Sequence, residues 1–73
     1  MYYRYKIEGI FINYDKYMGN CERDYIMIFP IGTTEEKAKE SFQQMTKDKK
    51  HYKNLSLFRK IYIHYEGEEE KIL

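Results

Sequence analysis

Few side chains in this sequence could act as a nucleophile or a base. The candidates are Cys21, His51 and His64, together with scattered carboxylates. A nucleophile needs a base beside it, and the base needs a third group that orients it. Cys21 falls in an expected hairpin loop, His51 follows two lysines, and His64 lies near the end of an expected strand. Because nothing in this spacing brings them together, we assign no catalytic residue and expect a protein that is not an enzyme; the alternative is a small hydrolase or nuclease.

A metal site and an internal disulfide are not expected either. One cysteine and two histidines at positions 21, 51 and 64 match no known ligand spacing. A single cysteine also cannot form a disulfide within the chain. No cofactor is predicted. With 73 residues, the chain makes one small domain, 1–73, whose marginal core needs tight aromatic packing or oligomerisation.

Charge and hydropathy narrow the class of partner. The net charge of +1 indicates neither an acidic mimic of DNA nor a strongly basic nucleic-acid-binding protein. The first residues alternate and have no apolar segment typical of a secretory signal. No apolar run approaches the roughly 20 residues of a membrane span. We therefore expect a cytoplasmic protein, in a bacterium or an infected host cell, without membrane contact.

Residues 2–14 are expected to form a long first strand. Tyr3, Tyr5 and Ile7 alternate with polar residues and Tyr2, the period-2 pattern of a half-buried strand. After Gly9 the pattern changes phase. A phase change at a glycine is typical of a β-bulge, which turns the following side chains to the other face. A tight turn at positions 8 and 9 is the alternative.

The rest of the chain alternates between loops, a helix and further strands. We expect a loop over 15–23, a second strand over 24–30, a linker over 51–54 and a third strand over 55–66. A helix is predicted over 34–49, because Thr33 and Glu36 have the spacing of a capping box. An acidic tail, expected to fray, begins near residue 67.

These elements predict an α+β fold in the order β-β-α-β. One helix packs on one face of a three-stranded, mainly antiparallel sheet. The first strand is favoured as the central one, and a central second strand is the alternative. The apolar positions of the strands and the helix stripe define the expected core: Ile7, Ile10, Ile12, Ile26, Ile28, Ala38, Phe42, Met45, Leu57, Ile61 and Ile63.

The layout resembles a group of short uncharacterised proteins. The features that carry this resemblance are the tyrosine-rich first strand, Gly-Thr-Thr-Glu-Glu-Lys-Ala-Lys-Glu over 32–40, and Tyr-Lys-Asn-Leu-Ser-Leu-Phe-Arg-Lys over 52–60. With nine isoleucines and no valine, the composition also indicates an A/T-rich genome. The chain resembles β-β-α-β proteins of phages and mobile elements from A/T-rich Gram-positive bacteria. The resemblance implies no activity and no catalytic residue.

The strands carry more aromatic residues than one helix can cover. This surplus predicts a surface that binds protein, either a second copy as a homodimer or a host protein, since tyrosine offers a large contact area with few rotatable bonds. The alternative is that tyrosines merely surround a small core. The candidate residues are Tyr3, Tyr5, Tyr25, Met27, Phe29, Phe58 and Tyr62.

A basic segment over 47–60 offers an alternative function. Its cations could contact phosphates while nearby tyrosines stack on bases. They could also be a solvated helix end, and the acidic tail could neutralise them. No known nucleic-acid-binding motif accompanies the segment, so nucleic acid is the less favoured partner. The candidate residues are Lys47, Lys49, Lys50, Lys53, Arg59 and Lys60.

Overall fold

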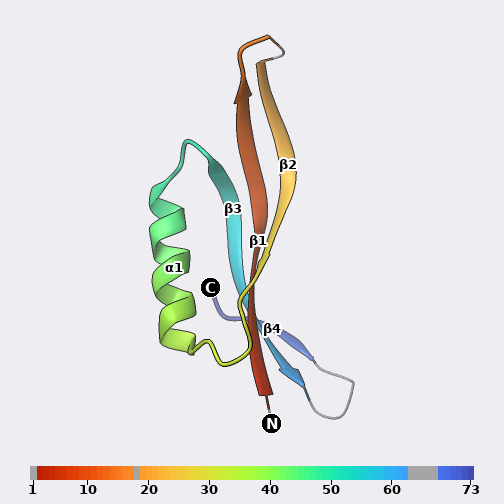
Figure 1. Cartoon of the computed structure of the whole chain (residues 1–73), viewed down its shortest axis with the longest axis vertical. Helices are drawn as coiled ribbons and strands as arrows, with labels where there is room; N and C mark the ends of the chain where they lie inside the picture. Colours follow the sequence, from red (N-terminus) through yellow and green to blue (C-terminus); the bar gives the residue numbers. More distant parts are fainter. Residues whose placement is uncertain (1, 18, 63–67) are drawn as a thin grey trace.

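The computed structural model describes residues 2–17, 19–62 and 68–73. The elements follow the order β1 (Tyr2–Asp15), β2 (Gly19–Ile28), α1 (Glu35–Lys47), β3 (Tyr52–Tyr62) and β4 (Glu69–Lys71). The strands form one sheet in the order β2-β1-β3-β4, with all neighbours antiparallel. The helix lies on one side of this sheet, and the β1–β2 hairpin extends well beyond the helix (Figure 1). The α+β class and the central position of the first strand are confirmed.

The sheet has four strands, so the expected number of three was wrong. The acidic tail, which we expected to fray, supplies β4 and extends the sheet beside β3. Its glutamates meet cations of β1 and β3: Glu69 accepts from Lys6 Nζ at 2.8 Å and Glu70 from Arg59 Nη2 at 2.7 Å. Beyond the strand, Ile72 packs against the core. Negative charge indicated a solvated tail, but here it holds the segment against the sheet.

The β1–β2 hairpin is longer than the sequence indicated. Residues 19–23, assigned to a loop, belong to β2, and Cys21 lies in the strand opposite Asn13. Gly19 begins β2 with a φ of 79°, a conformation that glycine adopts at little cost. The charged run over 22–24 indicated a loop, but it is equally compatible with an edge strand, where charge limits unwanted pairing.

A register shift occurs at Gly9, but the additional residue is in β3 and not in β1. Glu8 lies opposite Ser56, and Ile10 lies opposite Lys53, so two residues of β3 face Gly9 alone. Against β2, by contrast, β1 pairs through Gly9 without interruption. The bulge expected in the first strand was therefore placed on the wrong strand, and the alternative of a turn was also wrong.

Gly9 is explained by close packing rather than by a phase change in β1. In β3, Asn54 has a φ of 55° and adopts the left-handed conformation. The side chain of Leu55 then lies over the glycine: a Cβ at position 9 would come within 2.6 Å of Leu55 Cδ2. The absence of a side chain at Gly9 thus makes room for Leu55, which packs against the core.

Because β1 keeps its alternation, four of the eleven expected core residues lie on the other face. Ile10 and Ile12 of β1, with Ile26 and Ile28 of β2, occupy positions that alternate with the buried ones, and the prediction that these four are core residues was wrong. The buried core instead consists of Tyr5, Ile7, Phe29, Ala38, Phe42 and Leu57. Of the other expected members, Met45 packs against this core, Ile61 is half-buried, and Ile63 lies outside the described residues.

The helix begins one residue later than the capping-box spacing predicted. Thr34 is the N-cap, and its hydroxyl accepts a hydrogen bond from the backbone N–H of Lys37 at 3.2 Å. The hydroxyl of Thr33 instead donates to the carbonyl of Pro30 at 2.8 Å and closes the preceding turn. The helix ends at Lys47, earlier than expected.

The close approach of Leu55 to Gly9 predicts a stability effect. We expect Gly9→Ala to lower the free energy of unfolding by about 1–3 kcal/mol, the usual cost of overpacking. Urea denaturation measures this loss. In a Leu55→Ala background the nearest atom is gone, so the additional loss caused by Gly9→Ala should be clearly smaller. An equal loss in both backgrounds would contradict the packing explanation.

Candidate protein-binding surface

The aromatic residues assigned to a binding surface are mostly on the side of the sheet that the helix occupies. Tyr5 and Phe29 are 5 % and 6 % exposed and belong to the core, so their assignment to an open surface was wrong. Tyr25 and Met27 share this side and are half-buried. Tyr3 lies there as well, 42 % exposed, beneath the guanidinium of Arg59 at 5.3 Å. Two of these aromatic side chains, Tyr5 and Phe29, therefore lie in the same core as Ala38 and Phe42 of the helix.

The opposite side of the sheet, which we call the open face, has no helix on it. Phe58 is on this face, and the side chain of Tyr62, the last of the seven candidates, is outside what the structure describes. Residues directly opposite each other in neighbouring strands point to the same face. The registers therefore assign to the open face Arg4, Lys6, Glu8, Ile10, Ile12, Tyr14, Asn20, Glu22, Asp24, Ile26, Ile28, Lys53, Ser56, Phe58, Lys60, Glu69 and Lys71.

Isoleucines form the apolar part of the open face. Ile26 and Ile28, next to each other on the edge strand β2, are 61 % and 54 % exposed. Ile10 on β1 and Phe58 on β3 are half-buried. A shallow hollow of about 390 Å³ lies between these strands, with Ile10, Ile26 and Phe58 among its lining residues. This surface could not be predicted from the sequence, because isoleucines at alternate positions predict a core as readily as they predict a surface.

Charged residues of both signs surround the isoleucines. Lys6 Nζ lies 2.9 Å from Glu8 and 2.8 Å from Glu69. The hydrogen bond to Glu69, and to a smaller extent the one to Glu8, raises the pKa of Lys6. Lys53 pairs with Glu22 across the sheet. The open face therefore has exposed isoleucines on the edge strand β2, next to charges of both signs on the inner strand β1. Protein-binding surfaces likewise combine apolar and charged residues.

The basic segment does not form one patch. Arg59 lies on the helix side, where it pairs with Glu70 at 2.7 Å and with Glu35 of the helix at 3.7 Å. Its hydrogen bond to Glu70 raises the pKa of Arg59. Lys53 and Lys60 are on the open face. The remaining cations, Lys47, Lys49 and Lys50, lie at the end of the helix and in the turn after it. Carboxylates thus compete for Arg59 and Lys53.

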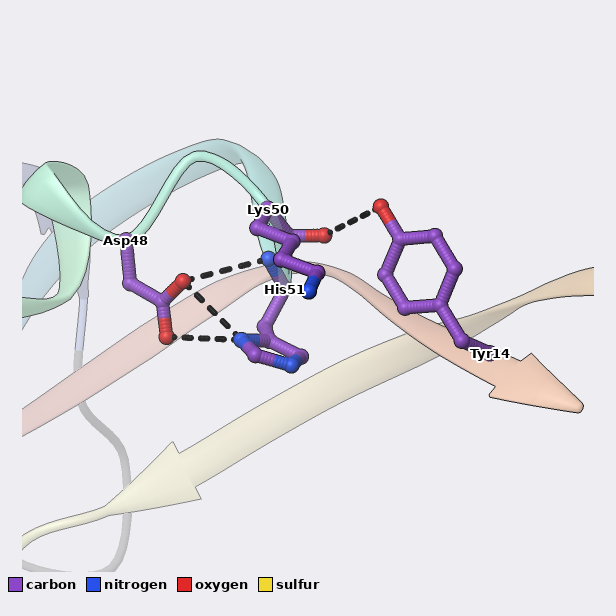
Figure 2. A network of polar contacts seen from close by, with 4 residues as sticks. All are labelled: Tyr14, Asp48, Lys50 and His51. Carbon is purple, nitrogen blue, oxygen red and sulfur yellow. Dashed lines mark hydrogen bonds and ion pairs between the residues drawn. The ribbon is translucent and has the colours of Figure 1, made fainter.

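His51 takes part in the turn that joins the helix to β3. Its Nδ1 lies 3.0 Å from both carboxylate oxygens of Asp48, and its backbone N–H donates to the same side chain (Figure 2). The hydroxyl of Tyr14 donates to the carbonyl of Lys50 at 2.9 Å. These contacts fasten the turn to the far part of β1.

Aromatic contacts continue this attachment along the helix side of the hairpin. The ring of Phe11 stacks on His51 at 6.3 Å and meets Tyr52 at 5.5 Å. Tyr25 lies edge-on to Tyr52 at 5.2 Å. The arrangement explains His51 as a structural residue: an imidazole beside a carboxylate resembles part of a catalytic site, but the nearby Tyr14 hydroxyl already donates to a carbonyl.

The remaining candidates for chemistry stay apart or undescribed. Cys21 is a half-buried free thiol within β2, and His64 lies outside the described residues. Within 2–17, 19–62 and 68–73, no three His, Cys, Asp or Glu side chains are grouped to hold a metal ion. In the same ranges no helix is long and apolar enough to cross a membrane.

Comparison with known proteins gave no relative. No family model, no curated protein and no solved structure matches the chain.

The shifted pKa values of Tyr5, Tyr25 and Lys6 predict how the stability of the fold depends on pH. Burial raises the pKa of Tyr5 and of Tyr25 above the ordinary 10.0, and carboxylates raise that of Lys6 above 10.5. Above these ordinary values the unfolded chain releases protons that the folded chain keeps. The contribution of the three groups to stability is therefore fully present below pH 10 and is lost as the pH rises further.

The midpoint of urea unfolding, measured from pH 7 to pH 12, tests this dependence. In the alkaline range the stability of the Tyr25→Phe variant should fall less steeply with pH than that of the wild type, because one of the three titrating groups is removed. An alkaline decline that is identical in the variant and in the wild type would show that Tyr25 does not contribute.

Proposed function

We propose that this is a non-enzymatic accessory protein that acts by binding another protein through the open face. The observation that carries the proposal is the exposure of Ile26 and Ile28, side by side on an edge strand. Large contiguous apolar patches are uncommon on monomers and mark interaction sites. Ile10 and Ile12 extend the apolar surface onto β1, and Phe58 lies on β3, on the other side of Lys6.

Charge on the open face favours protein over nucleic acid as the partner. Glu8, Glu22 and Asp24 lie among the isoleucines, and carboxylates there would repel phosphates. On the helix side, Arg59 already donates a hydrogen bond to the carboxylate of Glu70. A protein surface can complement both signs of charge, which a nucleic-acid backbone cannot.

The composition and the layout support a wider setting for this role. We propose that the protein serves a phage or another mobile element, in the cytoplasm of the bacterial cell, and that its partner is either a second copy or a host protein. The binding surface differs from the one that the aromatic surplus indicated: isoleucines and Phe58 replace the tyrosines.

Substitution of the two exposed isoleucines tests the proposal. We expect Ile26→Ser/Ile28→Ser to abolish binding to a partner identified by mass spectrometry and then purified, because about 1.5–3 kcal/mol is gained for each large aliphatic side chain that a complex buries. Binding is measured by calorimetry with nuclease-treated samples. Ile31→Ser is the matched control, since Ile31 is 70 % exposed but lies in the turn after β2.

Two results would contradict the proposal. The first is full binding by the Ile26→Ser/Ile28→Ser variant. The second is recovery that disappears with nuclease and weakens steeply with salt, which is the behaviour of a protein that binds phosphates. Circular dichroism of the variant establishes that it keeps the fold of the wild type.

A further inference from the structure

The arrangement of charge on the open face indicates which protein would cover it. Two neighbouring rows of side chains cross the sheet there. The first row contains Ile26, Glu8 and Ser56, and the second contains Ile28, Lys6 and Phe58, each in the order β2, β1, β3. In both rows an isoleucine is on β2 and a charge is on β1, but the two charges have opposite signs.

We propose that the occupant of the open face is a second copy of this chain, packed face to face about a two-fold axis that crosses the strands between these two rows. The inference rests on the proposed function. Such an axis keeps each strand over its own counterpart and exchanges the rows. Glu8 then faces Lys6 of the second copy, and Ile26 faces its Ile28, so apolar and charged positions are matched twice in one symmetric contact.

The other simple two-fold arrangement fails on the same residues. An axis parallel to the strands along β1 would place each row over itself. Lys6 would then face Lys6 and Glu8 would face Glu8, and like charges across an interface are unfavourable. The distribution of charge along β1 therefore selects the direction of packing as well as the partner.

The outer rows match on the β2 side and not on the β3 side. The row with Asp24, Ile10 and Lys53 lies beyond Glu8, and the row with Arg4 and Lys60 lies beyond Lys6. Exchange of rows places Ile10 over Arg4 of the other copy, with Asp24 diagonally opposite that arginine. On β3 it places Lys53 over Lys60, and the pairing of Lys53 with Glu22 of its own copy reduces the repulsion between them.

The open face extends along the longest dimension of the molecule. The molecule measures 48 × 23 × 18 Å, and the helix lies beside the sheet within its two longer dimensions, so the face takes up only part of the second (Figure 1). A standard interface takes about 800 Å² from each partner, with apolar residues at its centre and charges at its rim. Sheets packed in this way lie about 10 Å apart, close enough for isoleucine side chains of both copies to interdigitate.

Charge exchange between Asp24 and Arg4 tests the arrangement. Sedimentation equilibrium is expected to show a dimer for the wild-type chain. Asp24→Lys alone and Arg4→Glu alone should each raise the dimer dissociation constant roughly ten-fold or more, because like charges then meet at both ends of the contact. An equimolar mixture of the two variants should dimerise again, since the lysine introduced in one variant would then lie in the same row as the glutamate introduced in the other.

A second measurement avoids any dependence on charged variants. In a Cys21→Ser background, Ile26→Cys mixed with Ile28→Cys should form more crosslinked dimer with a short bifunctional maleimide than either variant does alone. The axis brings position 26 over position 28 of the other copy. Position 26 of the other copy lies farther away. Equal yields in the mixture and in the separate variants would exclude this axis.

Failure of this inference differs from failure of the proposed function. A wild-type chain that is monomeric at every soluble concentration, or variants that do not associate when mixed, would overturn the dimer. If a purified host protein then binds and depends on Ile26 and Ile28, the open face still binds protein and only its occupant is different. If neither association depends on these isoleucines, both proposals fail.

Discussion

Burial of two aliphatic residues beneath a single helix is the constraint on which the rest of this small fold depends. Ile7 and Leu57 lie opposite each other on the two central strands, and neither is exposed. Ala38 of the helix is also fully buried, and Phe42 lies one turn further along. A domain of this size buries a modest share of its surface, so this contact leaves little else to stabilise the chain. One helix can cover only one face, and the open face follows from that limit.

The elements of the fold could be predicted from the sequence because each has a local signal. The alternation around Tyr5 and Ile7 predicted the first strand, and the capping-box spacing of Thr33 and Glu36 predicted the helix. The face of each strand could not be predicted with the same success. Isoleucines and large aromatic residues alternate in β2, and both are suitable for a core. The choice is made by contacts distant in sequence, above all by Leu55 over Gly9, which keeps β1 regular.

The candidate site was displaced for the same reason. The strands carry more apolar residues than one helix can cover, whichever face the helix occupies. The assignment of this surplus to tyrosines depended on which face the helix covers, and Tyr5 proved to be buried while Ile26 proved to be exposed. The fourth strand was missed because its signal is charge. Glu69 and Glu70 are typical of a solvated tail until Lys6 and Arg59 are brought beside them by the other strands.

Exposure of Ile26 and Ile28 has a consequence for stability as well as for binding. A partner that binds only the folded chain shifts the folding equilibrium toward that state, and the shift grows with its concentration. Because this domain has a small core and an apolar face left uncovered, the same side chains that recognise the partner would add to the burial that the core lacks. The charged residues Glu22 and Asp24 on β2 limit indiscriminate pairing of its free edge. The isoleucines thus remain available for a partner that matches the charges around them, and association through the open face would make folding and recognition depend on each other.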